Sequence, residues 1–250
     1  MPSKHVAERN ATSWVPAPPQ LKSKFKSLPG TGKEIESIAT AFKKYLPQQE
    51  VVTFAGNEAT KSNLLKTLPK ANYAVLATHG FFDDSKSLAD FKNVAVGFHP
   101  DVRSGIALAG ANSSSNGILT ALEIKELDLA KLRVAVLSSC FSGAGVEVPG
   151  EGALGLNRNI LAAGCNNTVT TLNEVDDNAT QLLMGEFWNN LLAKKQRPEI
   201  ALRNAQLKIR RDYDSATQQF RNSLGVGQNS KTPISKTLFW APFVVTGHGF

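Results

Sequence analysis

Two short apolar runs in the sequence end at residues with reactive side chains, and this pair limits the possible fold more than any other feature. The runs cover residues 73–78 and 133–138, and both have the length and β-branched content of strands buried in a parallel sheet. His79 and Gly80 follow the first run, and Cys140 follows the second. Because ligands and reactive groups gather at the carboxyl ends of strands in an open α/β sheet, we expect His79 and Cys140 to meet at one edge.

These strand ends suit nucleophilic catalysis. A thiol attacks a carbonyl only as its thiolate, which needs a basic or cationic neighbour, and the His79 imidazole is such a group. The backbone amides of Gly80 and Cys140 are then expected to bind the oxyanion. The alternative is that Cys140 is buried and inert, as many cysteines are. The second cysteine, Cys165, is expected to pack as a small apolar residue.

Eight short segments, occurring in order along nearly the whole chain, resemble the CHAT domain, a caspase-like cysteine peptidase family related to separase. The resemblance implies a caspase-like sheet, a His–Cys dyad formed by His79 and Cys140, a protein substrate, and a backbone carbonyl that orients the imidazole. Members of this family are often joined to tetratricopeptide repeats. The segments are LPGT at 28–31, ATHG at 77–80, LSSC at 137–140, GEG at 150–152, LAAG at 161–164, DDNAT at 176–180, ALRNAQ at 201–206 and FWAPF at 239–243.

The predicted architecture is a single α/β domain at residues 28–250, with a mostly parallel sheet and helices on both faces. Residues 1–27 are rich in proline, lysine and serine and are predicted to be a tail or linker, although the family would have a first strand there. Residues 81–117 are predicted to be irregular and to border a substrate cleft; the alternative is a flexible insertion without a function. The sequence predicts helices at 33–45, 59–68, 122–127, 152–163, 177–193 and 198–211, and strands at 51–54, 73–78, 133–138, 168–172 and 243–246.

Composition excludes several classes of protein. The chain has 250 residues, 42% of them hydrophobic, which suits a domain with a sizeable core, and no apolar run approaches the ~18 residues of a membrane span. Two cysteines do not make a disulfide framework, so we expect a reducing, cytoplasmic location without membrane association. The net charge of +7 permits nucleic-acid binding, but an ordinary basic surface is favoured because aromatic residues are not interleaved with the cations.

No metal or cofactor is predicted. The four histidines lack the i, i+4 spacing of a zinc helix, and the cysteines have no close-spaced partner. The sequence GEGALG at 150–155 matches a dinucleotide-binding pattern, but no predicted strand leads directly into it. None of the other histidines, at positions 5, 99 and 248, follows a clear buried strand.

Three acidic residues follow the predicted strand at 168–172. Glu174, Asp176 and Asp177 would lie at the same edge of the sheet as the dyad, where a carboxylate pocket would select a basic residue before the cleaved bond. The simpler interpretation is that one aspartate caps the following helix and that the group is structural. Both interpretations stay open at this point.

The sequence therefore predicts a cysteine endopeptidase that cleaves a protein substrate after a basic residue. We expect its activity to depend on a tetratricopeptide-repeat or other regulatory partner, because a free peptidase would be hazardous to the cell. The alternative from another class is a catalytically silent module that keeps the fold and binds proteins.

Overall fold

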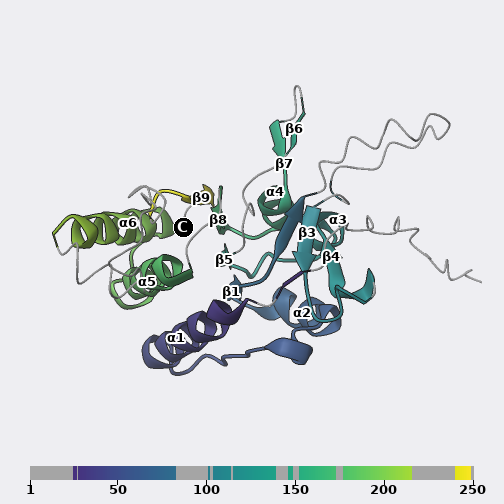
Figure 1. Ribbon diagram of the computed structural model, residues 1–250, viewed down its shortest axis with the longest axis horizontal. Coiled ribbons are helices and arrows are strands. Elements are labelled where there is room, and N and C mark those ends of the chain that lie inside the picture. Colours follow the sequence, from purple (N-terminus) through teal and green to yellow (C-terminus); the bar gives the residue numbers. More distant parts are fainter. Residues whose placement is uncertain are drawn as a thin grey trace, which may run out of the picture.

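A four-stranded sheet forms the centre of the molecule, in the strand order β1-β5-β8-β9 (Figure 1). The computed structural model describes residues 25–26, 28–82, 101, 104–113, 115–138, 146–148, 152–172, 177–215 and 240–248. Strands β1 (Tyr73–Leu76), β5 (Val134–Leu137) and β8 (Asn167–Thr171) are parallel, and β9 (Phe243–Gly247) runs antiparallel to β8. The sheet is mostly parallel, and its four strands confirm four of the five predicted ones.

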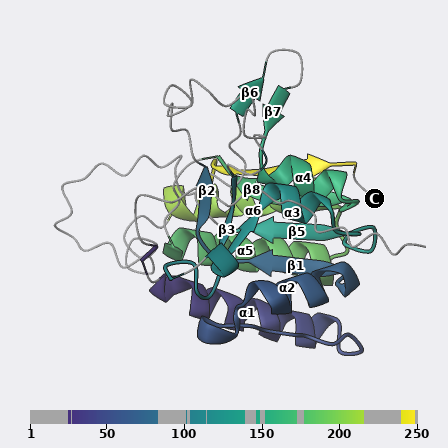
Figure 2. The same ribbon diagram turned by 90° about the vertical axis from the view of Figure 1, so that its right-hand side faces the viewer.

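Helices cover both faces of this sheet (Figures 1 and 2), as predicted. The reason is visible in β5, whose side chains alternate between two buried clusters. Val134 and Val136 belong to one cluster, Ala135 and Leu137 to the other, and none is more than 1% exposed. The first cluster involves α1 (Pro29–Tyr45), α5 (Asp177–Trp188) and α6 (Pro198–Ser215), and the second involves α2 (Lys61–Thr67), α3 (Ala121–Lys125) and α4 (Leu156–Ala162).

Aromatic contacts attach α1 to the sheet and to α5. The ring centroid of Trp188 lies 4.8 Å from that of Phe42 on α1 and 6.1 Å from that of Tyr73 on β1. Trp188 is fully buried, and edge-to-face contacts of this kind add to the hydrophobic stabilisation of a core. These contacts matter for the site because the short segment before α1 reaches His79.

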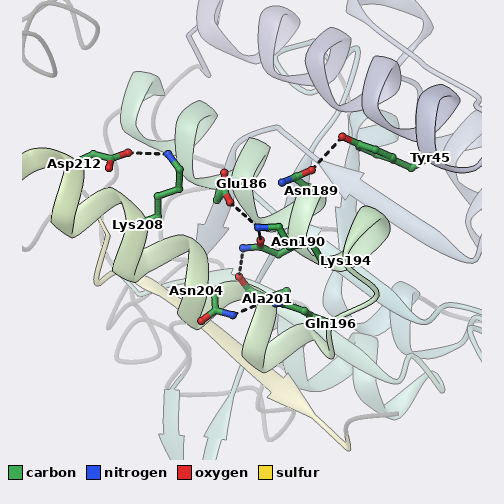
Figure 3. Close-up of polar contacts among 10 residues, drawn as sticks. All are labelled: Tyr45, Glu186, Asn189, Asn190, Lys194, Gln196, Ala201, Asn204, Lys208 and Asp212. Carbon is green, nitrogen blue, oxygen red and sulfur yellow. Dashed lines mark hydrogen bonds and ion pairs between the residues drawn. The ribbon is translucent and has the colours of Figure 1, made fainter.

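A polar network joins α5 to α6 across a π-helical turn at Asn189–Ala193 (Figure 3). The Asn190 amide donates a hydrogen bond to the Ala201 carbonyl at 3.2 Å, and its Oδ1 accepts one from Lys194 Nζ at 2.6 Å. Lys194 Nζ also lies 3.5 Å from Glu186. The sequence predicts a continuous helix over 177–193, whereas the α-helix ends at Trp188 and the turn follows.

A second, antiparallel sheet stands at the carboxyl end of β1 (Figure 2). It has the order β2-β3-β4, formed by Gly80–Phe82, Ser104–Ala107 and Ile118–Thr120. The prediction of an irregular segment over 81–117 is therefore wrong for these strands. An added Cβ at Gly105 would lie 2.3 Å from the Leu119 carbonyl oxygen, so glycine here permits a close approach of two strands and does not mark a loop.

Other boundaries also differ from the prediction. Residues 51–54 do not form a strand; no strand of the described chain pairs with them, and Val52 is 52% exposed. The predicted helix over 152–163 begins later, because Gly152–Leu154 pairs as β7 with β6 (Val146–Val148). Gly164 follows α4 with a φ of +106°, the left-handed conformation that glycine favours after a helix end. Among the described residues, no helix is both long enough and apolar enough to cross a membrane.

Candidate active site

The backbone of His79 is held between the two sheets. His79 lies between the end of β1 and the start of β2, and its carbonyl accepts a hydrogen bond from the Ala107 amide at 2.9 Å. The hydroxyl of the preceding Thr78 donates to the Ala107 carbonyl. Both polar backbone groups of Ala107, at the end of β3, are therefore used to hold the chain at His79.

The imidazole of His79 has a defined proton arrangement. Its Nε2 lies 2.7 Å from the carbonyl oxygen of Lys26, and because a carbonyl only accepts hydrogen bonds, Nε2 must carry a proton. In the neutral ring, Nδ1 is then the basic nitrogen. The Phe25 ring packs against the imidazole with centroids 5.4 Å apart and planes inclined by 34°, and it also lies 6.4 Å from the Phe81 ring. A hydrogen bond and a ring contact together orient this partly exposed side chain.

The register of the main sheet brings the two predicted strand ends together. Leu76 of β1 is paired with Leu137 of β5, and the Ser138 amide continues the ladder with a 3.1 Å hydrogen bond to the Leu76 carbonyl. His79 comes three residues after Leu76, and Cys140 comes three residues after Leu137. Cys140 itself lies outside the described residues, so its distance from His79 stays a prediction.

The start of α1 contacts the second strand end as well. The Ser138 hydroxyl donates a 2.7 Å hydrogen bond to Glu34, a carboxylate on the first turns of α1 that is only 6% exposed. Lys26, eight residues earlier, contacts His79. The segment from Lys26 to Glu34 thus binds both strand ends of the candidate site. None of these partners was found from the sequence.

The remaining predicted site residues are placed only in part. Gly80 begins β2, where it is paired with Ile106 of β3. Asp177 is the first residue of α5, which follows β8 at the same edge of the sheet, and nothing is described of its side chain. Glu174 and Asp176 lie outside the described residues. The choice between a cap and a specificity pocket therefore stays open.

The second cysteine is buried, and its surroundings disfavour the thiolate that a nucleophile needs. Cys165 is 2% exposed, and its thiol donates a 3.1 Å hydrogen bond to the Asn167 carbonyl. Burial raises the pKa of this thiol from its ordinary value of 9.0 to about 11, against the smaller lowering effect of hydrogen bonds with the Asn167 and Ala135 backbone. Cys165 therefore stays protonated at neutral pH, as its predicted packing role requires. Since the sequence has two cysteines, Cys140 is the remaining candidate nucleophile.

The fold and the residues at this edge agree with a comparison to protein families. The CHAT domain model matches residues 4–248. The chain belongs to the CHAT domain family. This family is related to the caspase-like peptidases, and the mostly parallel sheet with helices on both faces is consistent with that fold. Among curated proteins, no sequence gives a significant match. The matched range includes Phe25 and Lys26, which contact His79 although the sequence analysis placed them in a tail.

Sequence reasoning named His79 but missed the groups that orient it. These groups are the Phe25 ring and the Lys26 backbone carbonyl. The buried Glu34 carboxylate, which binds Ser138 at the other strand end, was missed as well. Every residue has a carbonyl, so no side-chain pattern marks Lys26. The only available signal was the family resemblance, which implies an orienting carbonyl without saying which one.

Proposed function

We propose that this chain is a cysteine endopeptidase of the CHAT domain family, with His79 and Cys140 as its dyad. The observation that carries the proposal is the hydrogen bond from His79 Nε2 to the Lys26 carbonyl. It leaves Nδ1 as the basic nitrogen, on a strand end that is in register with the strand leading to Cys140. A free Nδ1 near a thiol is what a cysteine nucleophile requires.

The reaction follows from these groups. His79 Nδ1 takes the proton of the Cys140 thiol, and the thiolate attacks the carbonyl carbon of the scissile peptide bond. The amides of Gly80 and Cys140 hold the oxyanion of the tetrahedral intermediate. The imidazolium then gives its Nδ1 proton to the leaving amine. Finally, water loses a proton to His79, attacks the thioester carbonyl and releases the acid and the thiol.

The Lys26 carbonyl has a role in each proton transfer. When Nδ1 gains a proton, the ring becomes an imidazolium, and its Nε2–H becomes a stronger hydrogen-bond donor. The carbonyl dipole therefore stabilises the charged ring without accepting a proton from it. With this carbonyl as its partner, the proposed dyad needs no carboxylate as a third member.

The substrate, the control and the location are also part of the proposal. Glu174, Asp176 and Asp177 form an acidic pocket that binds arginine or lysine before the cleaved bond. The substrate is a protein, and a tetratricopeptide-repeat or other regulatory partner controls activity. The chain works in a reducing, cytoplasmic compartment, where its thiols persist. Neither nucleic acid nor a membrane is needed.

The test is covalent labelling of the full chain by a peptidyl acyloxymethyl ketone that ends in arginine. We expect one adduct, on Cys140, and loss of peptidase activity of about 10³-fold or more in Cys140→Ala. Cys165→Ala is the matched control and should keep both labelling and activity. Labelling of Cys165, or an inert Cys140 in every condition including candidate partners, would support the silent binding module instead.

A second arm of the same experiment tests specificity. Citrulline has nearly the shape of arginine without its charge, so a citrulline ketone is the matched probe. The wild type should prefer the arginine probe, and either Asp176→Asn or Asp177→Asn should lose that preference. If both variants keep it, the acidic group is a structural cap.

A further inference from the structure

Phe25, Lys26, Asn112 and His79 form a connected polar assembly beside β3, and we propose that Asn112 is a positioning residue within it. The proposed role is to hold the backbone of Phe25 so that the next carbonyl, that of Lys26, stays on His79 Nε2. The expected effect of Asn112 on catalysis rests on the proposed function. Its physical content, the orientation and protonation of the imidazole, is measurable without any peptidase activity.

The first observation is a pair of hydrogen bonds between one side chain and one residue of backbone. Asn112 Oδ1 accepts from the Phe25 amide at 2.8 Å, and Asn112 Nδ2 donates to the Phe25 carbonyl at 2.9 Å. A carboxamide that uses its acceptor and its donor on one peptide residue imitates a neighbouring β-strand. Two bonds fix both the position and the rotation of that residue. The carbonyl of Lys26 is then directed by a backbone that is already held.

The second observation is that Asn112 stands on a turn with many internal hydrogen bonds. The turn follows β3, and the Leu108 amide bonds to the Gly117 carbonyl at 2.7 Å while the Ala111 amide bonds to the Leu108 carbonyl at 3.0 Å. An added Cβ at Gly117 would lie 2.0 Å from the Ala111 nitrogen, so the turn is closely packed on itself. The Ala109 amide also bonds to the Ala59 carbonyl at 2.9 Å, just before α2. These hydrogen bonds fix the backbone of the turn, so the position of the Asn112 side chain is well defined.

The third observation is that Asn112 and His79 share this support. Ala107, at the end of β3, binds the His79 carbonyl through its amide and the Thr78 hydroxyl through its carbonyl. The His79 imidazole bonds to Lys26, and the neighbouring Phe25 bonds to Asn112. From Asn112 the chain leads back along the turn to Ala107, which bonds to the His79 backbone. The hydrogen bonds therefore close a ring around the histidine. In this ring Asn112 supplies the link that joins the segment before α1 to the second sheet.

A competing interpretation predicts the opposite effect. If Phe25 and Lys26 occupied the substrate site, they would act as an inhibitory plug. Releasing them from His79 would then raise activity. A positioning role predicts that releasing it lowers activity, because the imidazole loses its orientation. The sign of the change separates the two.

The experiment compares three variants of the full chain. Asn112→Ala removes both hydrogen bonds, and Asn112→Asp keeps the shape and the acceptor but loses the donor to the Phe25 carbonyl. The control is Asn116→Ala, which makes the same chemical change at an exposed position nearby in the same connection. Thermal melts establish that each variant is folded, and the near-isosteric Asn112→Asp keeps the test valid if Asn112→Ala unfolds.

The first readout is the 15N spectrum of the His79 imidazole, assigned by its loss in His79→Gln and recorded in Cys140→Ala to prevent self-cleavage. We expect the wild-type pattern to be the Nε2-protonated form with a slowly exchanging proton. Both Asn112 variants should show mixed tautomers and fast exchange, and Asn116→Ala should match the wild type. An unchanged single tautomer in both Asn112 variants would overturn the inference.

The second readout is peptidase activity, with Cys140 intact. For both Asn112 variants we expect kcat to fall about twofold with little change in KM, because about half of the folded molecules would lose the orientation of the base. A rise in activity would overturn the positioning role in favour of the plug. If no form of the protein is a peptidase but the tautomer change occurs, the positioning role stands and the proposed function fails.

Discussion

Two asparagine side chains bind backbone groups of distant segments, and they do so in opposite surroundings. Asn190 is 1% exposed, and its carboxamide joins the turn after α5 to the Ala201 carbonyl and to Lys194. Asn112 is exposed, and its carboxamide joins the turn after β3 to the backbone of Phe25. The first binds two helices of the core together (Figure 3), and the second holds a short segment against His79.

The difference between these regions separates stability from site geometry. A buried hydrogen bond is costly to lose because its partners cannot turn to water, whereas an exposed one exchanges with water at little net cost. Residues that bind ligands or move during function commonly lie in the less stable parts of a fold. We therefore expect substitutions in the helical layer to change the free energy of unfolding and those around Asn112 to change the histidine.

The largest expected effect lies in the helical layer. Phe187→Ala removes a fully buried ring beside Trp188, with ring centroids 5.1 Å apart, and should lower the free energy of unfolding by about 3–5 kcal/mol. Urea unfolding measures this loss. Leu182→Ala is the control on the same helix, because Leu182 is 39% exposed. It should cost far less, and the His79 tautomer of the folded protein should be unchanged in both variants.

The buried Cys165 thiol should also make the free energy of unfolding depend on pH. The pKa of Cys165 is about 11 in the folded protein and 9.0 ordinarily, so the folded state keeps its proton over a range where the unfolded state loses it. The contribution of Cys165 to the free energy of unfolding is therefore fully present below pH 9. It is lost as the pH rises from 9 to 11, and the loss is on the order of 2 kcal/mol at the upper end. Urea unfolding under reducing conditions at several pH values measures the fall.

The control for this prediction is a difference between two proteins that share every ionisable group except Cys165. Cys165→Ala retains every other titrating group and should lose less stability between pH 9 and 11 than the wild type. Equal losses in the two proteins would show that burial of Cys165 does not set this part of the pH dependence.

The sequence predicted best where burial alone decides the structure. Residues 134–137 form a continuous apolar run because both faces of β5 are covered, and such a run is recognisable without any partner. His79 was recognised in the same way, since it directly follows a run of this kind. The small sheet was missed because its glycines resemble loop signals, while Gly105 serves the close approach of β3 to β4.

The support of the candidate site was less predictable, for a different reason. Lys26 contacts His79, and Phe25 contacts Asn112, through their backbone atoms, which every residue possesses. Their sequence separations are large, and no periodic pattern connects them. A segment rich in proline, lysine and serine is typical of a linker, so composition pointed away from a role for Phe25 and Lys26.

The smallest expected effect is the sharpest test of the comparison, because it uses the same substitution in both regions. Asn190→Ala leaves the buried Ala201 carbonyl without its side-chain donor and should lower the free energy of unfolding by about 1–3 kcal/mol. Asn112→Ala removes two hydrogen bonds, but both of these bonds are exposed to solvent, so the loss should be at most about 0.5 kcal/mol. Urea unfolding of both variants, side by side with the wild type, measures the two losses. If Asn112→Ala costs as much as Asn190→Ala, the segment before α1 is part of the stable core, and the proposed separation of stability from site geometry is wrong.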